Sequence, residues 1–427
     1  MVIKPPFKRV GPKGVFIILD GLGDRSIPEL DGKTPLEAAH TPNMNELAKR
    51  GMCGLVSHLS PWTPVGTQIG CGLLMGLAAD DVDSMRRGPI EALGAGLDLK
   101  ENDLAFRGNF ATLKPDGSGI IDRRSGRVSV NNHELAQALD GLEIDGVICR
   151  FKSATQHRLV VTLSGPNLSE AITDTDPGAS LCHKGVKVCR PMDNTDPDGQ
   201  RTARVVNKLM ERCREILAGH PLNKERVARG FPIANGILLR GPGVLRQPRN
   251  LIRRLAIKAG LVTGEGTLIG LAQLFGFTTV YEQAFTADEH TNLEGKMAAV
   301  LNLLEDHDIA YLHIKATDLF SHDRDPVGKQ QFLEKLDPIL EPLLDPNLVV
   351  AISADHSTDS NTGRHSGDPV PSLLSGPQCR RDPVESFGEF PCISGGLGQL
   401  TSTQFLCAFL DYMGQLRNYR PGDRAYY

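Results

Sequence analysis

The feature that most constrains this chain is a short apolar run, Asn347 to Ile352, that is followed closely by acidic and imidazole side chains. Its β-branched residues predict a buried strand. Asp355 and His356 come just after this run, and His365 follows in a loop rich in Gly, Ser and Pro. Because ligands collect at the carboxyl ends of strands in open α/β sheets, this segment predicts part of a metal site. A polar loop with a capping Asp and two solvated histidines is the alternative interpretation.

A second apolar run, Val15–Leu19, ends directly in Asp20. It predicts another buried parallel strand, and the glycines that follow it let the backbone turn sharply beside a ligand. Taken alone, Asp20 would be typical of an ordinary Asp-Gly turn. A second Asp at the end of a strand, feeding the same site, favours the interpretation of Asp20 as a metal ligand.

A third run, Asp308 to Ile314, predicts a strand that leads into Asp318 and His322. The spacing of these two side chains would place both on one face of a helix. The polar residues around them and Pro326 favour a loop instead. In either conformation, an Asp and a His again follow the end of a predicted strand.

A hydroxyl residue, Thr67, stands where a loop meets a predicted helix that is rich in glycine. The segment reads Pro64-Val-Gly-Thr-Gln-Ile-Gly-Cys-Gly72. Backbone N–H groups at a helix N-terminus can hold an anion, so a hydroxyl at this position is suited to accept a phosphoryl group. An isolated Thr there is more often only a helix cap. The small residues on both sides of Thr67 favour the first interpretation, because they indicate close approach of the backbone.

These segments together offer carboxylates, imidazoles and one hydroxyl. The candidate metal ligands are Asp20, Thr67, Asp318, His322, Asp355, His356 and His365. This number suits two divalent cations better than one structural zinc, which would favour cysteines and four closed ligands. Mixed Asp/His sites suit Mn²⁺ or Zn²⁺. Two such ions about 4 Å apart would clamp the attacking and leaving oxygens of a phosphoryl transfer.

Composition narrows the class of protein. The formal net charge is −4 and the pI is about 6.3, which gives no electrostatic case for a nucleic-acid or anionic-membrane partner. The nine cysteines are scattered without a CxxC pair, so we expect reduced thiols and a cytoplasmic protein. No apolar run has the length of a signal peptide or a membrane span.

The predicted pattern of strands and helices changes twice along the chain. From about Asn102 onward it predicts hairpin-like strands, among them 105–113 and 119–127 around a Pro-Asp-Gly turn. The parallel-type rhythm then resumes, with 251–259 expected as a strand and 264–275 as a helix. We therefore expect an α/β protein with a discontinuous core, 1–100 and 251–427, and an inserted α+β domain, 101–250.

Several motifs carry a specific resemblance. They are Leu19-Asp-Gly-Leu-Gly-Asp-Arg25, Lys33-Thr-Pro-Leu-Glu-Ala-Ala39, Asp122-Arg-Arg-Ser-Gly-Arg127, Lys315-Ala-Thr-Asp318 and His365-Ser-Gly-Asp-Pro-Val-Pro371. Together they resemble the archaeal-type 2,3-bisphosphoglycerate-independent phosphoglycerate mutases, which belong to the alkaline phosphatase superfamily. The match runs from about residue 15 to 415.

This resemblance implies a mostly parallel sheet core flanked by helices and an inserted substrate-binding domain. It implies that Asp318, His322 and His365 hold one Mn²⁺-type ion, and that Asp20, Thr67, Asp355 and His356 hold the other. It also implies a cytoplasmic glycolytic isomerase that needs no 2,3-bisphosphoglycerate. Thr67 would take the phosphoryl group from 3-phosphoglycerate and return it to the other hydroxyl, and Lys315 would neutralise the group in transfer.

Substrate contacts are expected from arginines, which bind carboxylates and phosphates in a forked geometry. The candidate arginines are Arg123, Arg124, Arg158 and Arg240, with His157 as a further contact and Asp122 orienting the hydroxyls of the glycerate. An ion pair at the surface is the alternative for each arginine. Many members of the family have Ser, then Asp, where this chain has Thr67 and Gln68. A metal-dependent hydrolase of phosphonates or phosphate esters therefore stays open as an alternative, and a homo-oligomer is compatible with the sequence.

Overall fold

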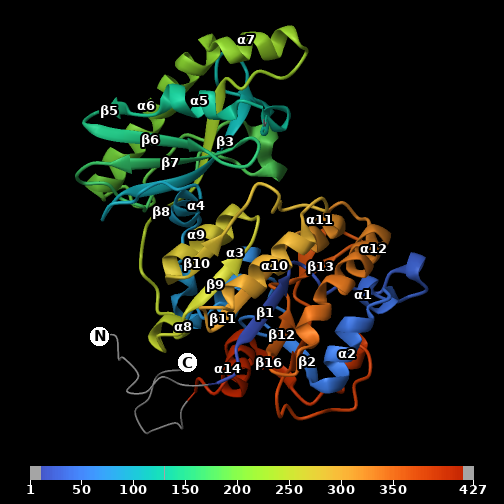
Figure 1. Ribbon diagram of the computed structural model, residues 1–427. Coiled ribbons are helices and arrows are strands. Elements are labelled where there is room, and N and C mark those ends of the chain that lie inside the picture. Colours follow the sequence, from blue (N-terminus) through green and yellow to red (C-terminus); the bar gives the residue numbers. More distant parts are fainter. Residues whose placement is uncertain (1–10, 129, 417–427) are drawn as a thin grey trace. The chain divides into compact units, whose positions relative to one another are not determined.

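The structure is a computed structural model, and it describes residues 11–128 and 130–416 (Figure 1). The chain divides into two compact units, residues 1–83 with 248–427, and residues 84–247. The sequence places the first boundary near 100. In the structure it falls earlier, because α4 (Arg87–Gly94) packs on β3 (Leu104–Leu113) of the second unit.

The first unit is built on an eight-stranded sheet in the order β10-β9-β11-β1-β12-β15-β2-β16. Its strands are β1 (Gly14–Leu19), β2 (Met52–Ser57), β9 (Ala259–Val262), β10 (Thr278–Val280), β11 (Ile309–Ile314), β12 (Val349–Ser353), β15 (Val370–Ser375) and β16 (Gly398–Thr401). All pairs are parallel except those of β15, which runs antiparallel to both neighbours. The three apolar runs predicted as strands are β1, β11 and β12, and each is buried throughout. The expected α/β class with a mostly parallel sheet is confirmed.

Helices flank this sheet (Figure 1). In one group α3 (Thr67–Leu74) contacts both α9 (Gly266–Phe275) and α14 (Ser402–Tyr412). Another group, joined through the 3₁₀ segment Asp337–Leu344, is α2 (Pro42–Arg50), α10 (Leu293–Leu303) and α12 (Pro326–Leu336). None of the described helices has both the length and the apolar character needed to cross a membrane.

One predicted strand is wrong. Residues 251–259 contain a short helix, α8 (Leu251–Arg254), and β9 begins only at Ala259. The helix forms because the side chain of Asn250 accepts a hydrogen bond from the N–H of Arg253 at 3.0 Å, a helix-capping contact. Its apolar residues are buried against the fold, so their hydrophobicity alone could not separate helix from strand.

The chain leaves the first unit and returns to it at neighbouring points. Residues Leu77 and Asn250 form an antiparallel bridge. The N–H of Ala78 donates to the carbonyl of Arg249 at 3.0 Å, and the guanidinium of Arg249 pairs with Asp81 at 2.7 Å. These contacts hold together the two chain segments, 77–81 and 249–250, through which the chain leaves and re-enters the first unit.

The second unit contains a six-stranded sheet in the order β4-β3-β7-β6-β5, with β8 also paired to β3. Its remaining strands are β4 (Ile120–Asp122), β5 (Leu142–Ile144), β6 (Val147–Ser153), β7 (Arg158–Ser164) and β8 (Gly236–Val244). Every pairing is antiparallel. Helices α5 (Asn132–Leu139) and α6 (Pro197–Gly219) form the main apolar core with the sheet, whereas α4 contacts β3, β7 and β8.

A lysine is buried in the first unit. Lys296, on α10, is 1% exposed, and its Nζ donates to the backbone carbonyls of Thr286 at 3.1 Å and His313 at 3.5 Å. No carboxylate lies within ion-pair distance of it among the described residues. Burial therefore lowers the pKa of Lys296 to about 8.

We expect Lys296→Met to raise the free energy of unfolding at pH 7 by about 1–3 kcal/mol, since it removes a desolvated charge. The folded protein releases this proton near pH 8, whereas the unfolded chain holds it until about pH 10.5. The wild type therefore gains stability as the pH rises through that window, and the difference between the two proteins should shrink. Urea unfolding of both proteins from pH 7 to 10.5 measures it. A difference that does not change with pH would contradict the assignment.

Candidate active site

Three neighbouring strands bring the predicted ligands to one edge of the sheet. β1 pairs in parallel with both β11 and β12, so the carboxyl ends of all three strands are adjacent. Asp20 follows β1, and Asp355 and His356 follow β12. The hairpin of β13 (Ser357–Asp359) and β14 (Arg364–Ser366) carries His365 back toward them.

Asp318 and His322 lie on a helix, α11 (Ala316–His322), so the loop favoured by the sequence is wrong. Pro326 does not interrupt this helix, because it begins the next one. Thr317 fastens the first turn by donating its hydroxyl to the carbonyl of Asp20. The four-residue spacing then places Asp318 and His322 on one face.

The ligand atoms form two groups. Asp318, His322 and His365 make one, Asp20, Asp355 and His356 make the other, and the atoms of each group lie within 4.8 Å of one another. His322 Nε2 lies 3.4 Å from Asp318 Oδ2, and His356 Nε2 lies 3.3 Å from Asp20 Oδ1. The two groups are the two ligand sets that the resemblance implies, apart from Thr67.

Each of the three imidazoles is oriented through its other ring nitrogen. Nδ1 of His322 lies 2.8 Å from the carbonyl of Gly363, and Nδ1 of His365 lies 3.0 Å from the carbonyl of Val65. A carbonyl can only accept, so both Nδ1 atoms donate and both Nε2 atoms keep a lone pair. This arrangement fixes the tautomer that ligates a metal through Nε2.

The third imidazole is fixed by a hydroxyl. Thr358 Oγ1 donates to Asp318 Oδ1 at 2.8 Å, so it has only a lone pair for His356 Nδ1 at 3.0 Å. His356 therefore also presents its Nε2 to the carboxylates. Neither Thr358 nor the buried His313, whose Nε2 lies 3.0 Å from Asp20 Oδ2, was predicted from the sequence. His313 lies within the strand β11, where only its two-residue distance from Lys315 could have singled it out.

Thr67 and Lys315 lie at the same place. Thr67 Oγ1 is 3.4 Å from His356 Nε2 and 3.4 Å from Lys315 Nζ. Lys315 Nζ also contacts Asp20 Oδ1 at 3.0 Å and Asp318 Oδ2 at 2.5 Å, so one ammonium group reaches a carboxylate of each ligand group. Although burial opposes it, these carboxylates raise the pKa of Lys315 above its ordinary value. Lys315 is therefore a fixed cation beside the hydroxyl.

The carboxylates of the site are crowded together away from solvent. Asp20, Asp318 and Asp355 are all buried. Burial and the charge of Asp20 raise the pKa of Asp355 to about 6. Burial alone would lower the pKa of His356, but Asp355 and Asp20 raise it to about 9. Buried carboxylates crowded with imidazoles that present Nε2 are a donor set that fits divalent cations.

Close backbone contact positions the helix that carries Thr67. Helix α3 begins at Thr67, with Gly66 as its cap residue. A Cβ on Gly70 would lie 1.8 Å from the carbonyl oxygen of Asp355, so any side chain there would push the helix away from the ligands. The prediction that the small residues allow tight backbone approach is confirmed.

Two of the arginines expected to bind substrate lie beside a buried carboxylate of the second unit. Arg123 forms a forked ion pair with Asp176, with Nε 2.8 Å from Oδ1 and Nη2 in contact with Oδ2. Arg240 Nε is 3.9 Å from Asp176 Oδ2 and has no hydrogen-bond partner among the described residues. Burial lowers the pKa of Arg240, and the neighbouring Arg123 lowers it further. Arg240 thus keeps a donor available, whereas the fork of Arg123 is engaged.

The other predicted contacts belong to the same unit. The carboxylate of Asp122 accepts from the backbone N–H groups of Arg124 at 2.8 Å and Gly126 at 2.5 Å, so it orders a turn. The side chain of Arg124 is exposed. His157 is buried, and burial with nearby arginines lowers its pKa to about 4, so it is neutral at pH 7. Arg158 begins β7.

Comparison with known proteins agrees with the resemblance in the sequence. The family model for 2,3-bisphosphoglycerate-independent phosphoglycerate mutase matches residues 48–223. A protein of that name from Ignicoccus hospitalis is 38% identical over 416 residues, which make up 95% of this chain and 99% of the relative. Another from Pyrococcus abyssi is 39% identical over 94% of this chain and 98% of the relative.

Solved structures show the same relationship. A protein of Pyrococcus horikoshii superposes with a TM-score of 0.82 at 31% identity, over 96% of this chain and all 100% of that one. The cofactor-independent phosphoglycerate mutase of Thermoplasma acidophilum has a TM-score of 0.69 at 33% identity, over 94% of this chain and 100% of that one. This chain therefore belongs to the 2,3-bisphosphoglycerate-independent phosphoglycerate mutases, a family of isomerases.

Proposed function

We propose that this protein interconverts 3-phosphoglycerate and 2-phosphoglycerate through a phosphorylated Thr67. The observation that carries the proposal is the hydroxyl of Thr67, which lies 3.4 Å from both His356 Nε2 and Lys315 Nζ. Membership of the mutase family supports the identity of the substrate. In this proposal 2,3-bisphosphoglycerate is not needed, because the phosphoryl group is held by the protein between the two half-reactions.

Two divalent cations are part of the proposal, with Mn²⁺ as the first candidate and Zn²⁺, Co²⁺ or Mg²⁺ as alternatives. Asp318, His322 and His365 would hold one, and Asp20, Asp355 and His356 with the Thr67 hydroxyl would hold the other. Bound there, they would favour the ionised form of the hydroxyl and neutralise the oxygens of the phosphoryl group.

The side chains of this unit would perform two matching transfers. Thr67 Oγ loses its proton and forms a bond to phosphorus while the bond from phosphorus to O3 of the substrate breaks, and O3 takes up a proton to give glycerate. The 2-hydroxyl oxygen of the same glycerate then loses its proton and forms a bond to phosphorus while the bond from phosphorus to Thr67 Oγ breaks, and Oγ takes up a proton to restore the hydroxyl. Lys315, charged and 3.4 Å from Oγ, would stabilise the phosphoryl group in each transfer.

The glycerate must stay bound between the two transfers. We assign this task to the second unit, where Arg124, Arg158, Arg240 and the neutral His157 offer donors to a carboxylate or hydroxyl. Asp122 would act indirectly, because its carboxylate orders the turn that bears Arg124. Arg123 would also act indirectly, because its guanidinium holds the buried carboxylate of Asp176 in place.

Phosphorus NMR tests the reaction. Incubation of the purified protein with 3-phosphoglycerate and Mn²⁺ is expected to produce the resonance of 2-phosphoglycerate and to leave free phosphate at the level of a blank. Free phosphate as the main product would instead support the alternative, a metal-dependent hydrolase of phosphate esters or phosphonates. The feature that favours this alternative is Gln68, a neutral residue directly beside Thr67.

A further inference from the structure

A buried ion pair lies beside the turn that follows β1 and Asp20. Lys329 belongs to helix α12, Asp24 comes at the end of the turn, and both side chains are 0% exposed. Lys329 Nζ lies 2.9 Å from Asp24 Oδ2. Taking two charges out of water is costly, and an apolar pair of similar volume is often at least as stable. Stability alone therefore does not explain the pair, and its other contacts indicate a further role.

The ammonium group of Lys329 also holds the backbone of this turn. Its Nζ donates to the carbonyl of Gly21 at 2.8 Å, and the N–H of Gly21 donates to Asp355 Oδ1 at 3.1 Å. Asp355 Oδ2 is buried and has no hydrogen-bond partner among the described residues. Its neighbour at 3.2 Å is His356 Nε2, which also presents a lone pair. One oxygen of Asp355 is thus engaged by the turn, and the other is available to a cation.

Asp24 ties the same turn to the hairpin of β13 and β14. Its Oδ1 accepts from the backbone N–H groups of Arg25 at 2.8 Å and Ser360 at 2.9 Å. Its Oδ2 accepts from the hydroxyl of Ser360 at 2.5 Å. Ser360 comes directly after β13, and β14 carries His365. The ion pair therefore connects α12 with two segments that carry candidate metal ligands.

The turn is packed too closely to shift without moving the ligands. Gly21 has a φ of +63°, and a Cβ on it would lie 2.7 Å from Thr358 Oγ1 and 2.8 Å from Asp318 Oδ1. The turn thus lies against both the β13–β14 hairpin and α11. Any displacement would move Asp20 together with the N–H group that contacts Asp355. The contacts that hold the turn in place therefore set the geometry of these ligands.

We propose that Lys329 and Asp24 are positioning residues of the metal centre, which hold the turn after β1 so that Asp20 and Asp355 face one cation. The inference rests on the two-cation part of the proposed function, and it assigns a role to two residues that are not ligands themselves. Groups that hold metal ligands in place typically contribute about 10- to 100-fold to metal affinity or activity. An ion pair with only a structural role would change stability and leave the affinity as it is.

The informative variant removes both charges, Asp24→Asn with Lys329→Met. Lys329→Met alone would leave a buried carboxylate without its cation and would destabilise the fold strongly. In the double variant, the new amide can keep the contacts of Asp24 with Arg25 and Ser360, so the contact with the carbonyl of Gly21 is lost selectively. We expect a Tm within about 5 °C of wild type. The Mn²⁺ dissociation constant, from EPR titration of free Mn²⁺, should rise by about 10- to 100-fold.

Activity should show the same defect in a form that excess metal repairs. At a Mn²⁺ concentration that just saturates the wild type, the double variant should lose about tenfold or more of its kcat. Higher Mn²⁺ should recover most of this loss. The KM for 3-phosphoglycerate should change by less than about threefold, because neither Lys329 nor Asp24 is among the proposed substrate contacts.

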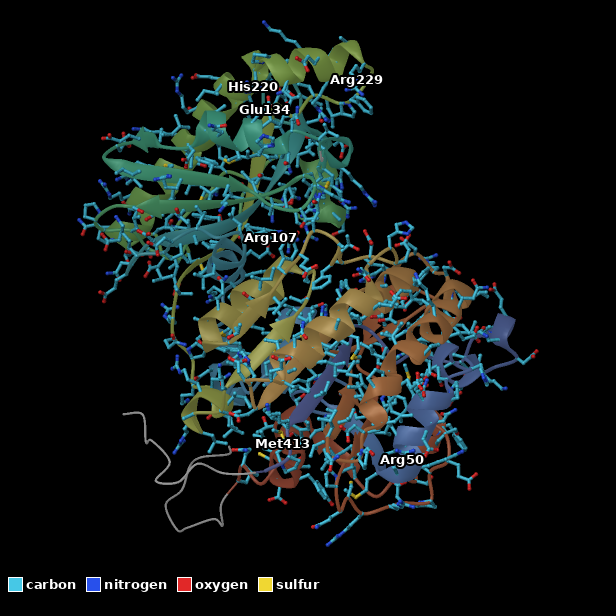
Figure 2. The ribbon with its side chains drawn as sticks, viewed as in Figure 1. Arg50, Arg107, Glu134, His220, Arg229 and Met413 are labelled. Carbon is cyan, nitrogen blue, oxygen red and sulfur yellow. The ribbon has the colours of Figure 1, made fainter. Side chains whose placement is uncertain are left out.

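Two controls lie in the same unit. Asp337, at the C-terminal end of α12, is buried and accepts from the N–H groups of Asn43 and Met44 at 2.9 Å each. Asp337→Asn should lower the Tm and leave the Mn²⁺ affinity within about twofold of wild type. Glu46→Gln with Arg50→Met removes a half-exposed ion pair of 2.6 Å and should change neither quantity. Figure 2 labels Arg50, at the end of α2 and well apart from α11 (Figure 1).

The outcomes are distinct. A Mn²⁺ affinity of the double variant within about threefold of wild type would overturn the proposal. So would a loss of affinity that Asp337→Asn shares in proportion to its lower Tm. If the wild type binds no Mn²⁺, the two-cation proposal fails by itself. Hydrogen exchange of residues 19–25 in the metal-free proteins then decides the positioning role: faster exchange in the double variant supports it, and equal exchange refutes it.

Discussion

Thr67→Ala is expected to lower the turnover of 3-phosphoglycerate by about four to six orders of magnitude, the loss typical of removing a nucleophile. Alanine has no oxygen to accept the phosphoryl group, and neither Lys315 nor His356 can replace it. Lys315 is held as a cation by two carboxylates, and His356 Nε2 faces Asp20 at 3.3 Å. Initial rates measured by coupling 2-phosphoglycerate formation to enolase would report the loss.

Two companion variants make the result specific. Thr67→Ser keeps a hydroxyl at the start of α3 and should retain turnover within about tenfold of wild type. Thr63→Ala removes an exposed hydroxyl from the loop before the helix and should change nothing. The Tm of Thr67→Ala should stay close to that of wild type, because the contacts of the Thr67 hydroxyl with His356 and Lys315 are long, at 3.4 Å. Turnover by Thr67→Ala above about one hundredth of wild type would show that another group is the nucleophile.

Asp355→Asn should have opposite effects on activity and on the stability of the metal-free protein. Activity should fall by about a thousandfold or more, because one proposed cation loses an anionic ligand. That cation would then no longer stabilise the transition state of phosphoryl transfer by several kcal/mol. In the presence of a chelator, however, the variant should be more stable than wild type by about 1–3 kcal/mol near pH 7.5. The reason is that the pKa of Asp355 is raised to about 6 in the folded protein, from an ordinary 3.8.

The pH dependence follows from that shift. The folded metal-free protein keeps the proton of Asp355 up to about pH 6, whereas the unfolded chain releases it near pH 3.8. Asp355 therefore costs the wild type no stability below about pH 4 and its full penalty above about pH 6. The advantage of Asp355→Asn should appear across this window. Asp323→Asn, which removes an exposed carboxylate next to α11, is the matched control.

Metal addition should reverse the order of stability. Mn²⁺ at 100 times its dissociation constant would stabilise the wild type by about 2.7 kcal/mol, and Asp355→Asn much less. Thermal unfolding with and without EDTA measures both effects. If EDTA changed neither the Tm nor the activity of wild type, the two-cation proposal would fail.

The positions at the sheet edge that the sequence predicts depend on short stretches of sequence. An apolar β-branched run fixes a buried strand, and the polar residue after it must then lie at the sheet edge, which is why Asp20, Asp355 and His356 could be grouped in advance. Thr67 was found in the same way, from glycines that allow close packing. The fold class followed from the same alternation of strands and helices.

Other parts depend on contacts between distant segments. Residues 251–254 are helical because Asn250 caps them, and the sequence shows apolar residues that suit either structure. The helix at Asp318 is fastened by Thr317 to a carbonyl almost three hundred positions earlier in the chain, a contact with no local signal. Lys329 lies in a stretch that predicts an ordinary helix, and only the folded chain shows that it is buried against Gly21 and Asp24.

The bridge between Leu77 and Asn250 and the pairing of Arg249 with Asp81 have a wider consequence. They join, within the first unit, the two chain segments that lead to and from the 164-residue insertion, 84–247. An insertion with so narrow a base can be gained, lost or exchanged in evolution while the catalytic scaffold keeps its shape.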